Sequence, residues 1–96
     1  MVYKTIDVEG NVFIDQIKIQ NKYTLNLDDI KEIPVDNLFV TTTGHALDIS
    51  ELRMIYKTLG GFFNPYKNKE PFSRDELMKL LQQFPEFKDS ISHQLP

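Results

Sequence analysis

The sequence predicts an α+β fold, in which a mainly antiparallel sheet of three or four strands is covered on one face by two C-terminal helices. Two observations predict this class. In the first half of the chain, apolar and polar residues alternate, which is typical of strands. In the second half, apolar residues recur at helical spacing, and two segments each begin with a helix-start pattern. We therefore expect a single small domain over residues 1–96, with an N-terminal meander followed by the helices.

The meander is predicted from three alternating segments. The first strand covers residues 2–8, and the turn composition of residues 9–11 indicates a hairpin after it. The return strand is predicted over residues 12–20, where three consecutive apolar residues break the alternation, as at a β-bulge or in a strand covered on both faces. A second turn leads to a third strand over residues 23–27.

The next segment has two interpretations. Ile30 and Ile33 have helical spacing, but Pro34 ends any helix soon afterwards, so residues 28–37 form either a single helical turn or an extended connection. Residues 38–43 are rich in β-branched and aromatic side chains and predict a fourth strand that ends at Gly44. Its neighbour in the sheet is either the first strand or the third.

The first helix has a start and an end that the sequence marks clearly. Asp48 can cap its opening turn, and Glu51, three residues later, can reach back to the cap. Gly60 stands where a left-handed residue ends a helix. Apolar side chains at one-face spacing lie between these signals: Ile49, Leu52, Ile55, Tyr56 and Leu59.

The second helix repeats the start pattern with Ser73 at the cap and Glu76 three residues later. It is predicted over residues 74–84, and Pro85 follows its end. Phe87 and Ile91 can add a short amphipathic turn. Residues 93–96 are expected to fray.

Composition favours an intracellular protein. The chain has no cysteine, so disulfides and thiolate metal sites are both excluded. No aliphatic or aromatic run exceeds three residues, and no charged-then-apolar signal peptide begins the chain, so we expect no membrane association and a cytoplasmic location.

Charge is distributed unevenly along the chain. Residues 1–52 contain four lysines and nine acidic residues, whereas residues 53–79 contain six basic and three acidic residues. Solvated helix termini explain part of this difference, since helix starts collect acids and helix ends collect bases. The basic segment nevertheless deserves consideration as a binding surface.

Catalytic and metal-binding residues are scarce. His45 follows two threonines and precedes a helix, where a hydroxyl and a base could face a ligand, but no carboxylate partner is set by its spacing. The acidic pairs Asp28-Asp29 and Asp7 with Glu9 do not fit a cation-binding loop. Gly60-Gly61 does not fit a phosphate-binding loop, because it follows a helix. We therefore expect neither enzymatic activity nor a metal or cofactor.

The sequence offers one candidate binding surface, in which cationic and aromatic residues interleave between the two helices. Such a mixture is typical of interaction hot spots, although the aromatic residues are equally suited to a small core. The predicted contact residues are Arg53, Lys57, Phe62, Phe63, Tyr66, Lys67 and Lys69.

These residues lead to two functional hypotheses. The first is a small non-catalytic protein-interaction or regulatory module. The alternative is a protein that binds single-stranded or non-specific nucleic acid through residues 53–79, where cations could contact phosphates and aromatic rings could stack on bases. The pI near 5.2 argues against general affinity for nucleic acid. The intervening connection of about twelve residues is also too long for a helix-turn-helix motif.

Overall fold

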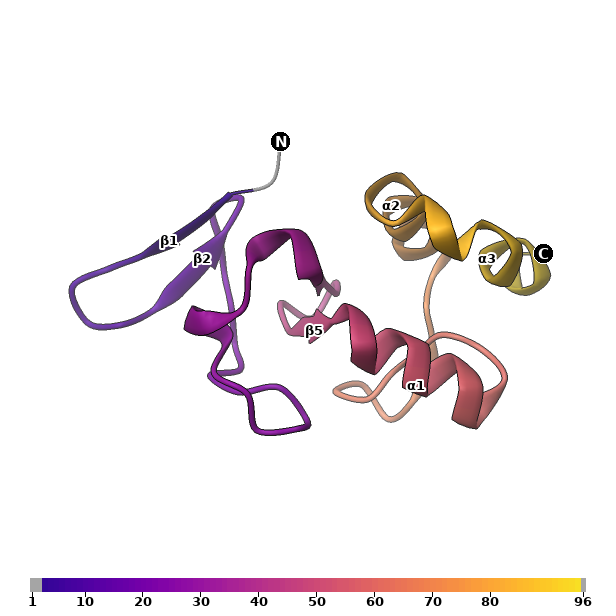
Figure 1. Cartoon of the computed structure of the whole chain (residues 1–96), viewed down its shortest axis with the longest axis horizontal. Helices are drawn as coiled ribbons and strands as arrows, with labels where there is room; N and C mark the ends of the chain where they lie inside the picture. The colour runs from indigo at the N-terminus through magenta and orange to yellow at the C-terminus, as the bar shows by residue number, and fades with distance from the viewer. Residues whose placement is uncertain (1–2, 96) are drawn as a thin grey trace. The chain divides into compact units, whose positions relative to one another are not determined.

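The structure is a computed structural model that describes residues 3–95, and it confirms the mixed α+β class. Short antiparallel strand pairs dominate the first half, and three α-helices lie in the second half (Figure 1). The chain divides into two compact units, Met1–Ile49 and Ser50–Pro96. Within residues 3–95, no helix is both long enough and apolar enough to cross a membrane.

The predicted N-terminal meander is present in the first unit. It consists of β1 (Lys4–Ile6), β2 (Val12–Ile14) and β3 (Ile17–Lys18), which form an antiparallel sheet in this order. Phe13 is the central residue, since it is paired with Thr5 on one side and with Lys18 on the other. Val2, which was included in the first predicted strand, lies outside the described residues.

The meander turns earlier than the sequence indicated. The predicted strand over residues 12–20 is divided by a two-residue turn at Asp15 and Gln16, whose φ angles are 49° and 69°. Two left-handed residues are the requirement of a tight type I′ hairpin turn, which usually contains glycine or asparagine. The break in alternation therefore marks this turn and not a bulge within one strand.

The third predicted strand is also corrected. Residues 23–27 form no strand, and a single bridge joins Tyr23 to Asp29. Thr24 and Asp28 close a turn between these two residues, because the Thr24 N–H donates to the Asp28 carbonyl oxygen at 2.8 Å. Tight turn bonding replaces strand pairing in this part of the chain.

Two short 3-10 helices occupy the segment that had two interpretations. They are η1 (Ile30–Glu32) and η2 (Val35–Asn37), and Pro34 lies between them. The Lys4 ammonium group donates to the carbonyl oxygens of Ile30, Lys31 and Ile33 at 3.3, 2.8 and 2.7 Å. The Lys31 and Ile33 carbonyl groups thereby gain a donor at the end of the turn, whereas the Ile30 carbonyl oxygen also accepts from the Ile33 N–H.

The fourth predicted strand pairs with neither the first nor the third. Instead, β4 (Leu38–Val40) forms a hairpin with β5 (Ala46–Asp48), in which Phe39 is paired with Leu47. The core of the first unit is aliphatic and includes residues from both of its sheets. Its buried members are Val12, Ile14, Ile19, Ile30, Ile33, Leu38, Val40 and Ala46.

The first predicted helix begins and ends where the sequence indicated. Helix α1 covers Ile49–Leu59 and follows Asp48 directly. Gly60 has a φ angle of +75°, and its N–H donates to the Tyr56 carbonyl oxygen at 2.8 Å. Glycine adopts this left-handed conformation without the steric cost that a side chain would add.

The second unit also contains a small hairpin that the sequence did not indicate. Its strands are β6 (Phe63–Asn64) and β7 (Glu70–Pro71). Asn64 organises the connecting turn, since its side-chain oxygen accepts a hydrogen bond from the Tyr66 N–H at 2.9 Å. The hairpin fixes the aromatic connection as an ordered element.

The C-terminal part of the second unit is helical. Helix α2 (Arg74–Gln83) has the predicted capping box, in which Ser73 and Glu76 exchange hydrogen bonds of 3.1 and 2.9 Å. The 3-10 helix η3 (Pro85–Phe87) and helix α3 (Lys88–Gln94) follow. His93 and Gln94 therefore belong to a helix, which corrects the expected fraying, while Pro96 lies outside the described residues.

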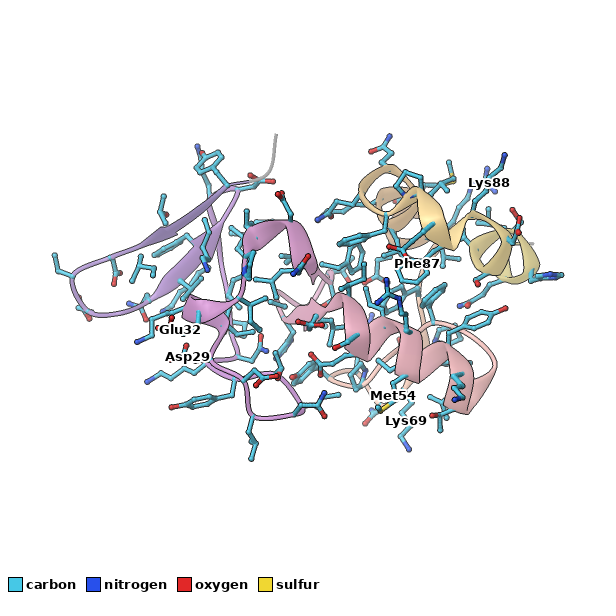
Figure 2. The ribbon with its side chains drawn as sticks, viewed as in Figure 1. Asp29, Glu32, Met54, Lys69, Phe87 and Lys88 are labelled. Atoms are coloured by element: carbon cyan, nitrogen blue, oxygen red, sulfur yellow. The ribbon has the colours of Figure 1, made fainter. Side chains whose placement is uncertain are left out.

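An aromatic core joins the elements of the second unit. Phe62 is its centre, with ring centroids 5.1 Å from Tyr56, 6.0 Å from Phe72 and 5.4 Å from Phe87. The ring centroid of Phe87, which is labelled in Figure 2, also lies 6.1 Å from that of Phe84. Tilted, edge-on and stacked ring pairs at these distances add to the stabilisation that burial alone provides.

Candidate partner-binding groove

The seven predicted contact residues have different environments. Phe62 is 0% exposed, so its ring belongs to the core and offers no contact surface. This corrects its assignment to the binding set. Phe63 and Tyr66 are half-buried, and the four cationic residues are exposed. The aromatic connection is therefore core at Phe62 and Phe72 and accessible at Phe63.

Two of the four cations already have acidic neighbours. Arg53 lies 2.8 Å from Glu86, and Lys67 lies 3.4 Å from Glu70. Lys57 and Lys69 form no ion pair with any of the described residues. The Lys69 side chain points into solvent (Figure 2). Exposed ion pairs are weak, so Arg53 and Lys67 can exchange partners at a cost below about 1 kcal/mol.

A groove lies beside Phe63, within the second unit. It encloses about 350 Å³ and is bounded by the end of α1, the β6–β7 hairpin and helix α3. Its lining residues are Tyr56, Gly60, Gly61, Phe63, Pro71, Ser90, His93 and Gln94. Apolar and aromatic side chains with a few polar groups are the usual lining of binding pockets.

Gln94 fixes the backbone beneath this groove. Its side-chain nitrogen donates to the Phe62 carbonyl oxygen at 2.8 Å, and its side-chain oxygen accepts from the Phe62 N–H. A Cβ atom on Gly61 would lie 3.0 Å from that oxygen and 3.0 Å from the Phe63 ring. Because Gln94 is held by two hydrogen bonds, it cannot move aside easily, and the space requires glycine at position 61.

Three side chains of the groove have polar groups that could bind a ligand. They are the Tyr56 hydroxyl, the Ser90 hydroxyl and the His93 imidazole, and none of them hydrogen-bonds to another part of residues 3–95. Tyr56 and Ser90 are half-buried, and His93 is exposed. The groove can therefore combine apolar contact with directional hydrogen bonds.

The sequence indicated only part of this groove. Phe63 was in the predicted set, but Pro71, Ser90 and His93 were not. The available signal was the Gly60-Gly61 pair after Tyr56, which leaves space at the end of α1. The helix that contributes Ser90 and His93 was expected to be a short turn, so its side chains could not be placed.

The second candidate, His45, lies in the loop between β4 and β5. Its Nδ1 atom is 2.8 Å from the Thr43 hydroxyl, which is itself 2.8 Å from the Thr41 hydroxyl. The His45 N–H donates to the same Thr41 hydroxyl at 3.3 Å. Burial lowers the pKa of His45 below its ordinary value of 6.5. These hydrogen bonds join His45 to two threonines of the same loop and stabilise the loop conformation.

The acidic pairs act as caps of turns. Asp7 accepts hydrogen bonds from the Asn11 side chain and from two backbone N–H groups, and the bond from the Asn11 side chain contributes most to lowering the pKa of Asp7. Asp29 accepts from the Lys31 N–H at 2.9 Å. Among residues 3–95, no group of three or more histidine, cysteine or acidic residues could hold a metal ion.

Comparisons of the chain with protein-family models, with curated proteins and with solved structures found no match. The functional proposal therefore rests on the chemistry of the groove and of its neighbouring cations.

Proposed function

We propose that the protein is a small, non-catalytic interaction or regulatory module of the cytoplasm, which binds a partner protein through the groove beside Phe63. The observation that supports this proposal is the aromatic and proline lining of an open groove, with hydroxyl and imidazole groups available on its wall. Exposed aromatic residues on a rigid frame are the usual anchors of protein interfaces.

The groove and its surroundings favour a particular partner chemistry. Its volume of about 350 Å³ suits one or two apolar side chains, and Tyr56 and Pro71 can flank them. Lys57 follows Tyr56 on α1, and Lys69 lies in the β6–β7 turn, so unpaired cations are available on neighbouring segments. We therefore propose a partner segment that combines an apolar side chain with nearby acidic residues.

Binding of nucleic acid remains the alternative proposal, since residues 53–79 contain six basic and three acidic residues. The structure offers this alternative less support than it offers the first. Phe62 and Phe72 are buried, so their rings are not accessible for base stacking. Arg53 and Lys67 already have acidic neighbours. Binding of labelled single-stranded oligonucleotides that weakens with salt would favour this alternative.

The first proposal is tested with two matched variants. Phe63→Ala removes an aromatic wall of the groove, whereas Met78→Ala removes an exposed apolar side chain of α2 that does not line it. Partners are captured from the native cell with the wild-type protein, identified by mass spectrometry, produced pure and measured by calorimetry. We expect Phe63→Ala to weaken binding at least about tenfold, the loss typical of a hot-spot residue, and Met78→Ala to leave it unchanged.

Thermal unfolding of both variants accompanies the measurement. If Phe63→Ala bound a purified partner as tightly as wild type while remaining folded, the groove would not be the contact surface. If Phe63→Ala failed to fold, Tyr56→Phe, which removes only one hydroxyl, would serve as the second variant.

A further inference from the structure

Strand β1 is paired along one edge of its backbone. The Tyr3 carbonyl oxygen accepts from the Asp15 N–H at 3.0 Å, and the Asp7 N–H donates to the Asn11 carbonyl oxygen at 3.0 Å. In an antiparallel ladder, every second residue directs its backbone groups toward the paired strand. Residues 3, 5 and 7 therefore face β2, and the backbone groups of the residues between them point away from it.

Lys4 and Ile6 are the residues of β1 whose backbone N–H and carbonyl groups point away from β2. No hydrogen bond joins these groups to another part of residues 3–95. β1 is also an outer strand of its sheet, since β2 is the strand that is paired with it (Figure 1). We call the outward backbone groups of Lys4 and Ile6 the β1 edge.

The β1 edge lacks the charge that usually protects the edge of a sheet. Exposed lysines on an edge strand hinder the addition of another strand. Lys4 is the charged residue of β1, but its ammonium group is held by the carbonyl oxygens of residues 30, 31 and 33. Ile6 is apolar and 48% exposed. Protection is left to the short length of β1, which weakens the binding of an added strand without excluding it.

The pattern of the β1 edge indicates what binds there. Its donors and acceptors repeat at every second residue, about 7 Å apart. An extended polypeptide presents donors and acceptors at the same repeat, whereas phosphate groups present acceptors alone. Ile6 is paired with the buried Val12 and shares its face of the sheet, so an apolar side chain beside Ile6 would extend the core of the first unit.

A second copy of the chain suits the β1 edge less well than a single extended segment does. If two β1 strands paired antiparallel, residues 4 and 6 of both copies would lie on one face of the joined sheet. The turn that contains η1 contacts Lys4, and two copies of this turn would have to share the space beside both Ile6 side chains. An extended segment brings no such bulk.

We propose that the β1 edge binds an extended segment of a partner protein, which adds a strand beside β1 and places an apolar side chain next to Ile6. The backbone groups of Lys4 and Ile6 supply the hydrogen bonds. This inference does not depend on the groove beside Phe63, so either proposal can fail while the other holds.

Amide hydrogen exchange of the full chain, followed by NMR, tests whether the edge is open. Thr5 is paired with Phe13, so its amide should exchange at least about tenfold more slowly than those of Lys4 and Ile6. Slow exchange of Lys4 and Ile6 in dilute protein would show that the edge is closed and would overturn the proposal. Protection of the two amides that rises with protein concentration would assign the edge to a second copy and would also overturn it.

A synthetic peptide then tests strand addition, because main-chain hydrogen bonds give such contacts most of their affinity. The probe alternates valine and threonine between terminal lysines, and N-methylation along one of its edges prevents it from forming sheets with itself. We expect it to slow exchange of the Lys4 and Ile6 amides. The control peptide is N-methylated along both edges and should bind at least about tenfold more weakly. Equal binding of the two peptides, or no binding of the probe at its solubility limit, would overturn the proposal.

Two matched variants locate the contact. Ile6→Pro removes an outward N–H and spares the bonds to β2, so it should fold and bind the probe at least about tenfold more weakly. Ile6→Val keeps the N–H and an apolar side chain, and should bind it nearly as well as wild type. If Ile6→Pro failed to fold, Ile6→Lys, which places a charge on the edge, should show the same loss. Unchanged binding in the folded variant would show that the probe does not pair with β1.

Discussion

Leu27 lies in the turn that Thr24 and Asp28 close, and its φ angle of +67° is left-handed. Bulky side chains rarely adopt this conformation. A left-handed conformation costs a bulky residue about 1–2 kcal/mol, and glycine avoids this cost while losing more chain entropy on folding. We expect Leu27→Gly to raise the free energy of unfolding by about 0.5–1 kcal/mol, measured by urea denaturation of dilute protein.

The turn over residues 7–11, which has the same backbone hydrogen-bond pattern as the turn that contains Leu27, provides the control for this prediction. Gly10 has a φ angle of +85°, and a Cβ atom there would meet no other atom within 4 Å. Gly10→Ala should therefore lower stability by about 1 kcal/mol through backbone strain alone. If Leu27→Gly lowered stability as well, the Leu27 side chain would be stabilising the folded chain by more than its backbone strain costs.

The lowered pKa of His45 predicts that stability depends on pH. Burial lowers its pKa in the folded protein below 6.5, so the folded protein binds a proton less readily than the unfolded chain does. The stabilisation from neutral His45 is therefore complete above the unfolded pKa of about 6.5, and it is lost as the pH falls through the folded pKa.

We expect the free energy of unfolding to decrease between about pH 7.5 and pH 5, the range in which histidine titrates. His45→Gln, which cannot titrate, should show a smaller decrease over the same range. Urea denaturation at several pH values measures both slopes. A slope that is unchanged in His45→Gln would assign the pH dependence to other groups.

At the scale of elements, two neighbouring phenylalanines at the start of the β6–β7 hairpin have different environments. Phe62 is fully buried and contacts three aromatic rings, whereas Phe63 is half-buried beside the groove. We expect Phe62→Ala to lower the free energy of unfolding by about 3–5 kcal/mol. Phe63→Ala should cost less, about 1–2 kcal/mol, because part of the Phe63 ring is already in contact with water.

Chemical denaturation measures both losses of stability. For partner binding we expect the opposite order, with the specific loss in Phe63→Ala. The Phe63 substitution should weaken binding while the protein remains folded. Equal destabilisation by the two substitutions would indicate that Phe63 is a core residue and that its groove is not a surface for partners.

At the scale of the whole molecule, the two units differ in both core and charge. The first unit has an aliphatic core and a net charge of −4, whereas the second has an aromatic core and a net charge of +1. The expectation of one domain over residues 1–96 stays a prediction. The two units therefore differ in the charge that they present to a partner.

The sequence by itself determined the features that depend on a few neighbouring residues. The α+β class, the start of α2 at its Ser73–Glu76 capping box and the end of α1 at Gly60 follow from local periodicity and from caps. The meander also followed from alternation, although its last strand lies earlier than predicted.

Only the tertiary structure decided which strands pair, which phenylalanine is buried and where a groove opens. β4 pairs with β5, because that register buries Leu38 and Val40 in the aliphatic core. Phe62 and Phe63 share one sequence context, but Phe62 lies directly before strand β6 and Phe63 begins it, and only the Phe62 ring meets the rings of distant elements. Such contacts join residues far apart in the chain, so their free energies leave no signal in any short stretch of sequence.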